Sequence, residues 1–409
     1  MPDAITVTPL TRARAFAGLP RSARIALSIA SYLRRGSLEV QLPDKRKLLF
    51  QGTEPGPSAT MVVHDFGFAW RVLRGGDLGI AESYLRGEWE TPNLTEFLYL
   101  FCVNVEMMQA ILRGKPLVRW MQVFRHWLNR NTRRQARKNI HAHYDLGNDF
   151  YRAWLDPTMT YSSALFDQGS NDLSAAQLRK YESLAQQIQL KHGQSILEIG
   201  CGWGGFAEYA AKTFGANVTG LTISQEQHDY ARKRMFDAGL ADKVTIKMLD
   251  YRDETGVYDR IASIEMIEAV GEQFWPDFFR QMRDRLVAGG VAGIQAITIQ
   301  ERFFDNYRRE IDYIRRYVFP GGMLPPPSVL KSLGSHFGIP LVGEKVFGDD
   351  YARTLAVWRD RFRAAWPSLV PLGFDERFRR LWEYYLAYCE AGFLSRNIDV
   401  RQMIFAKPA

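Results

Sequence analysis

The chain has 409 residues, 46% of them hydrophobic, which is enough apolar material to bury a core in each of about two or three domains. No stretch reaches the roughly 18 uncharged apolar residues of a membrane-spanning helix, and the N-terminal residues lack the apolar core of a secretory signal. We therefore expect a cytosolic protein, or one that contacts a membrane from outside. The cysteines, Cys102, Cys201 and Cys389, are far apart and the seven histidines show no ligand spacing, so we expect reduced thiols and no metal site.

The net charge of +8 is concentrated in the N-terminal third of the chain. Residues 1–144 carry 21 Lys and Arg against 11 Asp and Glu, whereas the rest of the chain carries 32 against 34. Within residues 107–144 no acid occurs, while nine Lys or Arg alternate with the aromatic residues Trp120, Phe124 and Trp127. This pattern is typical of a helix on an anionic membrane surface, but it also suits nucleic acid or a solvated linker helix.

From residue 194 onward, strand and helix patterns alternate. Apolar, β-branched runs predict strands at 194–200, 216–223, 243–250, 258–265 and 291–299. Helices are expected between them at 203–215, 224–239 and 274–290, with Ser224 as an N-cap and Gly215 and Gly239 as helix ends. This alternation predicts a doubly wound, parallel α/β sheet. Residues 300–340 break the rhythm with aromatics and arginines at helical spacing, which predicts either a substrate wall or an amphipathic helix docked on the sheet.

A glycine-rich stretch, LEIGCGWGGFAEYAAK at residues 197–212, fits the G-x-G-x-x-G pattern of dinucleotide-binding proteins. A dinucleotide fold holds the ribose with an acid at the end of the second strand, but here that strand ends VTGLTIS, without an acid. The acid-x-Gly-x-Gly form, Glu198 to Gly202, instead matches motif I of class I methyltransferases, which bind S-adenosylmethionine. There the glycines let the backbone approach the ligand, and the carboxylate can engage its positive charge.

Five segments occur in a characteristic order: HYDLGNDFYRAWLDPTMTYSSALF (143–166), the stretch from LEIGCGWGG to ISQEQ (197–227), MLDYRDETGVYDRIASIEMIEAVG (248–271), YVFPGGMLP (317–325) and YARTLAVWRDRF (351–362). Together they resemble the cyclopropane-fatty-acyl-phospholipid synthase family, relatives of the mycolic acid cyclopropane synthases. A further segment, RVLRGGDLGIAESYLRGEWE at 71–90, resembles the small N-terminal domain of that family.

The resemblance implies transfer of a methyl or methylene group from S-adenosylmethionine to the cis double bond of an acyl chain in a membrane phospholipid. It favours a cyclopropane product and leaves open a methyl- or methylene-branched one. It also implies a small basic N-terminal domain (1–112), a basic linker helix (113–139) and a class I methyltransferase domain with helical insertions (140–409). We expect a homodimer, bound peripherally to anionic lipid at the inner face of a bacterial membrane.

Carried over by position, the resemblance assigns the cofactor contacts to a segment before the first strand and to the loops after the first three strands. These residues are Tyr161, Ser162, Leu197, Glu198, Gly200, Gly202, Gly204, Gly205, Thr222, Ser224, Gln227, Tyr251 and Arg252. The amide of Gln227 is expected to bind the ribose hydroxyls in place of the missing acid.

The resemblance further implies a bound bicarbonate ion as the base that removes a proton from the transferred methyl group. The positions that match its ligands are Glu268, Gln295 and Tyr351, with main-chain groups of Ser163 and Ile297. Two positions depart from the family, because Gln295 replaces a histidine and Ser163 a cysteine. A glutamine still donates an N–H to an anion but carries no charge, so we expect the anion site to survive. The residues alone leave open whether Glu265 or Glu268 is a surface residue, and only the resemblance favours Glu268.

Attack of an alkene on the methyl group leaves a carbocation, which aromatic faces can stabilise by cation–π attraction. Candidates to line an acyl tunnel are Phe304, Tyr307, Tyr313, Tyr317 and Phe319. Core packing is the ordinary role for any one of them. Cys389 matches a cysteine of the family, and we interpret it as structural because a thiolate nucleophile has no role in this reaction.

Three other classes of protein compete with this interpretation. A nicotinamide-dependent dehydrogenase is disfavoured by the missing ribose acid. A nucleic-acid methyltransferase would explain the basic N-terminal region, but the fourth strand lacks an Asn-Pro-Pro-Tyr-like motif and the chain has no Pro-Cys nucleophile. A non-catalytic lipid-binding protein would keep the basic segment without needing the glycine loop.

Overall fold

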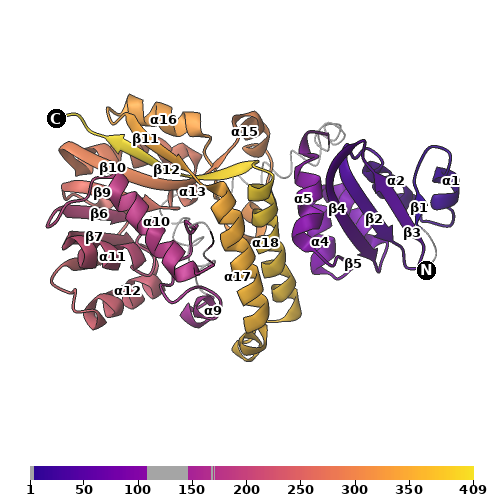
Figure 1. Cartoon of the computed structure of the whole chain (residues 1–409), viewed down its shortest axis with the longest axis horizontal. Helices are drawn as coiled ribbons and strands as arrows, with labels where there is room; N and C mark the ends of the chain where they lie inside the picture. The colour runs from indigo at the N-terminus through magenta and orange to yellow at the C-terminus, as the bar shows by residue number, and fades with distance from the viewer. Residues whose placement is uncertain (1–3, 108–145, 167–168, 170) are drawn as a thin grey trace. The chain divides into compact units, whose positions relative to one another are not determined.

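The computed structural model describes residues 4–107, 146–166, 169 and 171–409. The expected basic linker helix at 113–139 lies outside these residues. The chain divides into two compact units (Figure 1). The first unit comprises Met1–Arg125, Glu310–Tyr313 and Val370–Asn397, and the second comprises His126–Arg309, Ile314–Leu369 and Ile398–Ala409.

The first unit contains a five-stranded sheet, which the sequence patterns did not predict. Its order is β1-β3-β2-β4-β5, where β2 pairs antiparallel with β3 and parallel with β4. Buried Leu38 and Val40 alternate with more exposed residues along β2, so one face of the sheet packs inward. The strands are β1 (Ile5–Thr6), β2 (Arg35–Gln41), β3 (Lys47–Gln51), β4 (Glu54–Val63) and β5 (Trp89–Glu90).

The helices of the first unit come from both ends of the chain. Those described are α1 (Arg12–Ala15), α2 (Arg21–Ala30), α3 (Gly67–Gly75), α4 (Asp77–Leu85), α5 (Leu94–Cys102) and α18 (Glu376–Leu394). The late helix α18 contacts α4 and α5. Asp375 caps α18 by accepting a bond from Phe378 N, and Glu390 of α18 accepts a bond from the Thr95 hydroxyl of α5 at 2.8 Å.

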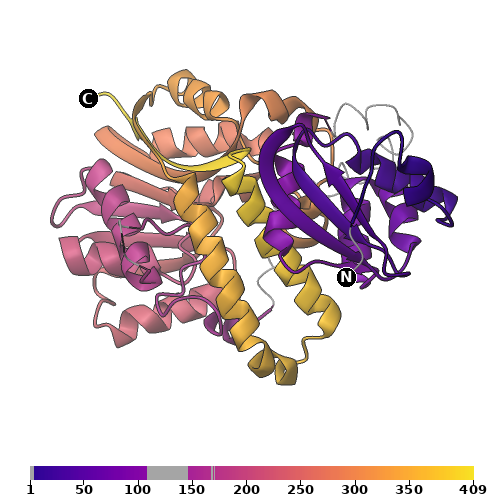
Figure 2. The ribbon, with the colours of Figure 1, turned by 45° about the vertical axis from the view of Figure 1, so that its right-hand side comes forward.

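The second unit is built on a seven-stranded sheet in the order β11-β12-β10-β9-β6-β7-β8. Figure 2 shows the ribbon from a second direction. The pairs from β10 to β8 are parallel, as the alternation of strands and helices predicted, and β12 runs antiparallel to both of its neighbours. The strands are β6 (Ser195–Ile199), β7 (Asn217–Thr222), β8 (Val244–Met248), β9 (Tyr258–Ile264), β10 (Leu286–Ile299), β11 (Leu341–Val346) and β12 (Ile398–Ala406). The predicted doubly wound class is confirmed.

Helices cover both faces of this sheet (Figure 1). One core joins α10 (Leu173–Gln187), α11 (Gly205–Phe214) and α12 (Gln225–Asp237) to the sheet, and the other joins α14 (Trp275–Arg285) and α16 (Pro327–His336) to its opposite face. Along β12, Met403 packs in the second core and the adjacent Ile404 in the first, as the two-residue period of a strand requires. Other helices of the unit are α9 (Asn148–Arg152), α13 (Ile267–Val270), α15 (Glu301–Tyr307) and α17 (Gly348–Leu369).

Several predicted helix boundaries are confirmed. Ser224 Oγ accepts a hydrogen bond from Gln227 N at 3.4 Å and caps α12, while Gly215 ends α11 with φ +56° in the left-handed region. The 300–340 insertion forms α15, a π-helical turn at Ile314–Val318 and α16. None of the helices within the described ranges combines the length and the apolar character that a membrane span requires.

Candidate active site

The glycine loop follows β6 at the carboxyl edge of the parallel strands, where α/β sheets bind their ligands. Gly202 has φ +53°, and a Cβ atom built there would meet no heavy atom within 4 Å. The loop therefore borders open space that a ligand can enter. Gly200 and Gly204, at φ +82°, also lie in the left-handed region, which lets the loop turn tightly between β6 and α11.

Glu198, at the end of β6, is 3% exposed. Its Oε2 atom is buried without a hydrogen-bond partner among the described residues. Burial raises the pKa of this carboxyl to about 8, although Lys180 and Arg234 oppose the shift. An unsatisfied carboxyl oxygen beside a glycine loop fits a cationic ligand, so these residues fit S-adenosylmethionine.

The loop after β7 orients the amide of Gln227. Gln227 Oε1 accepts a hydrogen bond from Thr222 Oγ1 at 3.0 Å, and the Thr222 hydroxyl also accepts one from Ser224 N at 3.2 Å. Since the amide oxygen is engaged, the Gln227 N–H groups are the ones that can donate to a ligand, and their bond to the ribose hydroxyls stays a prediction.

After β8, Tyr251 and Arg252 lie in a short 3₁₀ turn. Asp250 binds the Arg252 guanidinium with both carboxylate oxygens, at 2.8 and 2.6 Å. The guanidinium carbon also lies 5.4 Å from the centroid of the Phe274 ring. Arg252 is therefore held in place by its neighbours, while the Tyr251 ring packs 5.5 Å from Phe278. Direct cofactor contacts of Tyr251 and Arg252 remain predictions.

The segment that carries Tyr161 and Ser162 is braced by α10. Lys180 Nζ donates to Ser162 Oγ at 2.6 Å, and Gln177 Nε2 donates to the Ser162 carbonyl at 2.9 Å. The Tyr161 ring packs against both Trp154 and Trp358, with centroid separations of 5.6 and 5.4 Å. Sequence reasoning missed Lys180, although its position on the buried face of α10 was a signal for it.

Glu265, which follows β9, is the centre of a hydrogen-bonded cluster. Its Oε1 accepts bonds from Ser163 N at 2.8 Å and Gln295 Nε2 at 2.7 Å, and its Oε2 accepts one from the Tyr351 hydroxyl at 2.6 Å. The three donors are those predicted to hold a bicarbonate. Burial raises the pKa of Glu265, while Tyr351 and Lys180 lower it.

Glu268 lies one turn further on, in α13, and accepts a hydrogen bond from Ile297 N. Its Oε2 atom is buried and has no hydrogen-bond partner within the part of the chain that is described. The sequence left open whether Glu265 or Glu268 faces the surface, and in the structure both carboxyls accept hydrogen bonds inside the second unit. The structure thus brings the predicted residues together, but around Glu265, which the sequence did not single out. Its place directly after a strand was the available signal.

These contacts decide how well a bicarbonate fits. Ser163 N, Gln295 and Tyr351 donate to the Glu265 carboxylate, and Ile297 N donates to Glu268. A second anion would meet carboxylate oxygens where it needs donors. The residues in this arrangement do not fit a bicarbonate.

The aromatic residues predicted to line an acyl tunnel do not all belong to one unit. Tyr313 lies in the first unit, where its hydroxyl donates to Leu381 O at 2.9 Å and its ring packs 4.6 Å from Tyr384. In the second unit, the Phe304 ring stacks 6.3 Å from Trp275. Tyr307, Tyr317 and Phe319 also belong to the second unit, and their contact with substrate stays a prediction.

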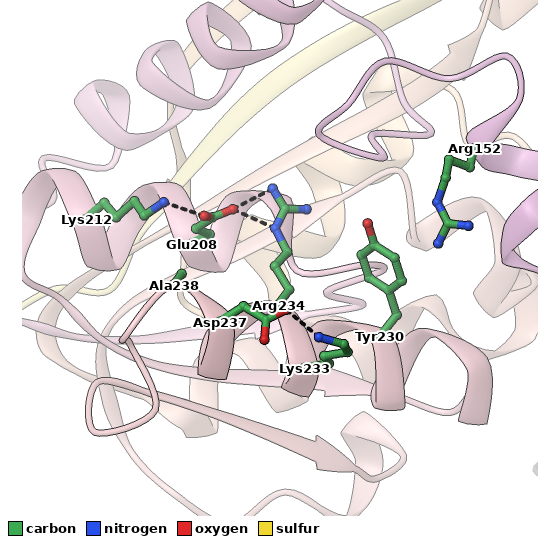
Figure 3. Close-up of a pocket in the computed structure, with 8 residues that line it drawn as sticks. All are labelled: Arg152, Glu208, Lys212, Tyr230, Lys233, Arg234, Asp237 and Ala238. Carbon is green, nitrogen blue, oxygen red and sulfur yellow. Dashed lines mark hydrogen bonds and ion pairs between the residues drawn. The ribbon is translucent and has the colours of Figure 1, made fainter.

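A pocket beside α11 and α12 contains none of the predicted site residues (Figure 3). Its basic side chains are paired: Lys212 and Arg234 both bind Glu208, and Lys233 binds Asp237. Arg234 also donates to Thr158 O at 2.7 Å and to Trp203 O at 3.3 Å, which ties α12 to the glycine loop. The lining residues are Arg152, Glu208, Lys212, Tyr230, Lys233, Arg234, Asp237 and Ala238.

The sheet order with its antiparallel β12, the glycine loop after β6 and the buried Glu198 define a class I methyltransferase dependent on S-adenosylmethionine. Comparison with known proteins identifies the family more closely. The chain belongs to the mycolic acid cyclopropane synthetase family, whose model matches residues 131–403. The resemblance stated from the sequence is therefore confirmed.

The chain is similar to relatives over nearly its whole length. It is 38% identical over 408 residues to the tuberculostearic acid methyltransferase of Mycobacterium tuberculosis, covering 95% of this chain and 93% of that protein. It is 34% identical over 373 residues to the cyclopropane-fatty-acyl-phospholipid synthase of Escherichia coli, covering 90% and 92%. A solved mycolic acid cyclopropane synthase with bound S-adenosylhomocysteine is 29% identical, with a TM-score of 0.63 over 66% of this chain and 98% of that one.

Proposed function

We propose that the protein transfers a one-carbon unit from S-adenosylmethionine to the cis double bond of an unsaturated acyl chain in a membrane phospholipid. The observation that carries this proposal is the partly buried carboxyl pair, Glu265 and Glu268, on the segment that follows β9 of the methyltransferase sheet. Methylation of an alkene leaves a carbocation that must lose a proton to give a neutral product, and a base partly shielded from water suits that step. The names of the two relatives above, a tuberculostearic acid methyltransferase and a cyclopropane-fatty-acyl-phospholipid synthase, support the same substrate class.

The cofactor supplies an electrophilic methyl group, and the residues of the chain supply position and charge. An alkene is a weak nucleophile, so alignment of the two reactants must contribute several kcal/mol, within the roughly 7–11 kcal/mol that orientation can provide. The glycine loop and Gln227 orient the donor. Phe304 and Tyr307 are proposed to face the cationic carbon of the acyl chain, where their rings would stabilise the charge.

Two products are compatible with this chemistry, and both have lost one proton from the transferred methyl group. Ring closure gives a cyclopropane, as the family resemblance favours. A hydride shift before proton loss gives a methylene branch, and reduction of that branch would give a methyl branch. The second candidate is favoured by the relative whose name refers to tuberculostearic acid.

Nuclear magnetic resonance of lipids from cells expressing the protein separates these products. The cyclopropane and the methylene branch have the same mass, but ring protons resonate far upfield and methylene protons in the olefinic region. We expect one of these two signals to appear with the native chain and not with an empty vector. Unchanged acyl chains would contradict the proposed function.

We further propose that the protein acts as a homodimer bound peripherally to anionic bilayers, through the basic residues 1–144. The boundaries of its small N-terminal domain (1–112) and linker (113–139) remain part of this proposal. Each cation near an anionic surface contributes about 1 kcal/mol, and salt screens that attraction over about 8 Å at physiological ionic strength. Co-sedimentation with anionic vesicles should fall as salt rises. Equal, salt-independent binding to neutral and anionic vesicles would contradict the proposed surface.

A further inference from the structure

We propose that the Glu265 carboxylate itself removes the proton from the transferred methyl group, so that the reaction needs no bound anion as base. This inference rests on the proposed methyl transfer to a lipid double bond. It follows from the observation that the residues expected to bind a bicarbonate ion bind a carboxylate of the chain instead. The donors that an anion requires are present, but the chain has placed one of its own carboxylates among them.

The geometry around Glu265 fixes the carboxylate in position. Three hydrogen bonds, from Ser163 N, Gln295 Nε2 and the Tyr351 hydroxyl, restrain both oxygens at 2.6 to 2.8 Å. The Glu265 N–H also donates to the Gln295 carbonyl at 2.7 Å. Glu265 has φ +52°, which a residue other than glycine adopts only where the surrounding structure imposes it. Such a backbone outlier beside a ligand loop is a feature of functional sites.

The neutral amide of Gln295 is matched to this carboxylate. Gln402 Nε2 donates to Gln295 Oε1 at 3.1 Å, which leaves the Gln295 N–H groups to face Glu265. Gln402 is itself held, because its Oε1 accepts bonds from Ser183 Oγ at 2.8 Å and Gln187 Nε2 at 2.6 Å. A protonated histidine in place of Gln295 would form an ion pair with Glu265 and weaken it as a base. A neutral glutamine at position 295, in place of the histidine of the family, is therefore what a carboxylate base at Glu265 requires.

The nearby charges divide the two carboxyls into a base and an acid. Burial raises the pKa of Glu265, and the hydrogen bond from Tyr351 and the charge of Lys180, whose ammonium lies 2.6 Å from Ser162 Oγ, oppose that rise. Burial, and then the negative charge of Glu265, raise the pKa of Glu268 to about 8, so Glu268 keeps its proton at neutral pH. Neighbouring carboxyls in different environments are a recurring arrangement for acid–base work.

The proposed step balances without an oxidant or a further reactant. The alkene π electrons form the new C–C bond to the methyl carbon, and the pair of the breaking C–S bond stays on sulfur. The other alkene carbon is then cationic. Glu265 takes a proton from the new methyl group, and the released C–H pair closes the ring. If a hydride has first moved between the two carbons, the same pair forms a methylene double bond.

The test compares native full-length protein with Glu265→Gly and Glu265→Gln, using S-adenosylmethionine and vesicles of unsaturated phosphatidylglycerol. Each is assayed in carbonate-free buffer and after addition of bicarbonate or formate, by measuring both S-adenosylhomocysteine and modified acyl chains. Glycine readily adopts the backbone conformation at φ +52° and leaves empty the space that the Glu265 carboxylate fills. Glutamine has about the same size as glutamate and keeps that space filled. Glu182→Gln, an exposed carboxylate on α10, is the control for the lost charge.

We expect native activity to be unchanged without bicarbonate, and both Glu265 variants to lose about 10²- to 10⁴-fold, the usual contribution of a general base. Added formate or bicarbonate should partly restore Glu265→Gly, but not Glu265→Gln, and Glu182→Gln should match the native protein. Native activity that appears only with bicarbonate, or full activity in both variants, would overturn the inference while leaving methyl transfer intact. A native protein that modifies no lipid under either condition would overturn the proposed function, and this inference with it.

Discussion

Gly202→Val is expected to abolish measurable binding of S-adenosylmethionine while the protein stays folded. The native backbone has φ +53° there, where a β-branched residue is strained by about 1–3 kcal/mol. No heavy atom lies within 4 Å of the added Cβ position, so the substitution meets no clash inside the protein. The side chain instead fills the open space in front of the glycine loop, which the cofactor must enter. Titration calorimetry measures the loss, and circular dichroism verifies the fold.

Gly239→Val provides a matched control for this experiment. Gly239 has φ +68° and likewise no heavy atom within 4 Å of its Cβ position, but it follows the C-terminal end of α12. Both variants should lose a similar amount of thermal stability, because the backbone strain is alike. Only Gly202→Val should lose the cofactor. Unchanged affinity in a folded Gly202→Val protein would remove the glycine loop from the cofactor site.

Glu198→Gln is expected to weaken binding of S-adenosylmethionine by about 10- to 100-fold, since a bond to a charged group contributes about 1.5–3 kcal/mol. In the free protein burial raises the pKa of Glu198 to about 8, against the opposing charges of Lys180 and Arg234. The carboxyl is thus largely protonated at neutral pH. A cationic ligand favours the ionised form, so binding should release a proton, and the affinity of the native protein should increase with pH up to about 8.

Calorimetry in two buffers of different ionisation enthalpy measures this proton directly. The native protein should release a fraction of a proton near neutral pH, and Glu198→Gln should release less. The free energy of unfolding depends on pH in the opposite direction to the affinity for the cofactor. Because the pKa of Glu198 is higher in the folded than in the unfolded chain, the protonated group stabilises the fold at pH values below its unfolded pKa. This stabilisation is lost as pH rises through about 8. Native affinity that is independent of pH, or a variant that keeps the pH dependence, would contradict the role of Glu198.

The parallel part of the second unit was predictable because its signals are local. Each strand is a short apolar run, Ser224 caps its helix and Gly215 ends one, and these features act within a few residues. The antiparallel β12 was missed because its pairing with β10 joins residues about a hundred positions apart. Periodicity cannot indicate such a pairing.

The composition of the site was also predictable, but its centre was not. The family resemblance supplied Ser163, Gln295 and Tyr351, and the structure places all three together. Whether they meet Glu265 or Glu268 depends on how the chain turns after β9. That turn uses a positive φ at Glu265, a conformation that a glutamate rarely adopts and that no sequence pattern predicts.

The place of α18 in the first unit has a consequence for the order in which the chain folds during synthesis. The strands of that unit are complete by Glu90, but the helix that contacts α4 and α5 ends at Leu394. Tyr84 contacts Tyr384 and Thr95 bonds to Glu390, so each of these contacts forms only after about three hundred further residues have been synthesised. Domains that emerge whole fold as they appear. Here the N-terminal part must remain incomplete until α18 has been made, so emergence of α18, rather than emergence of the N-terminal sheet, sets when this unit can close.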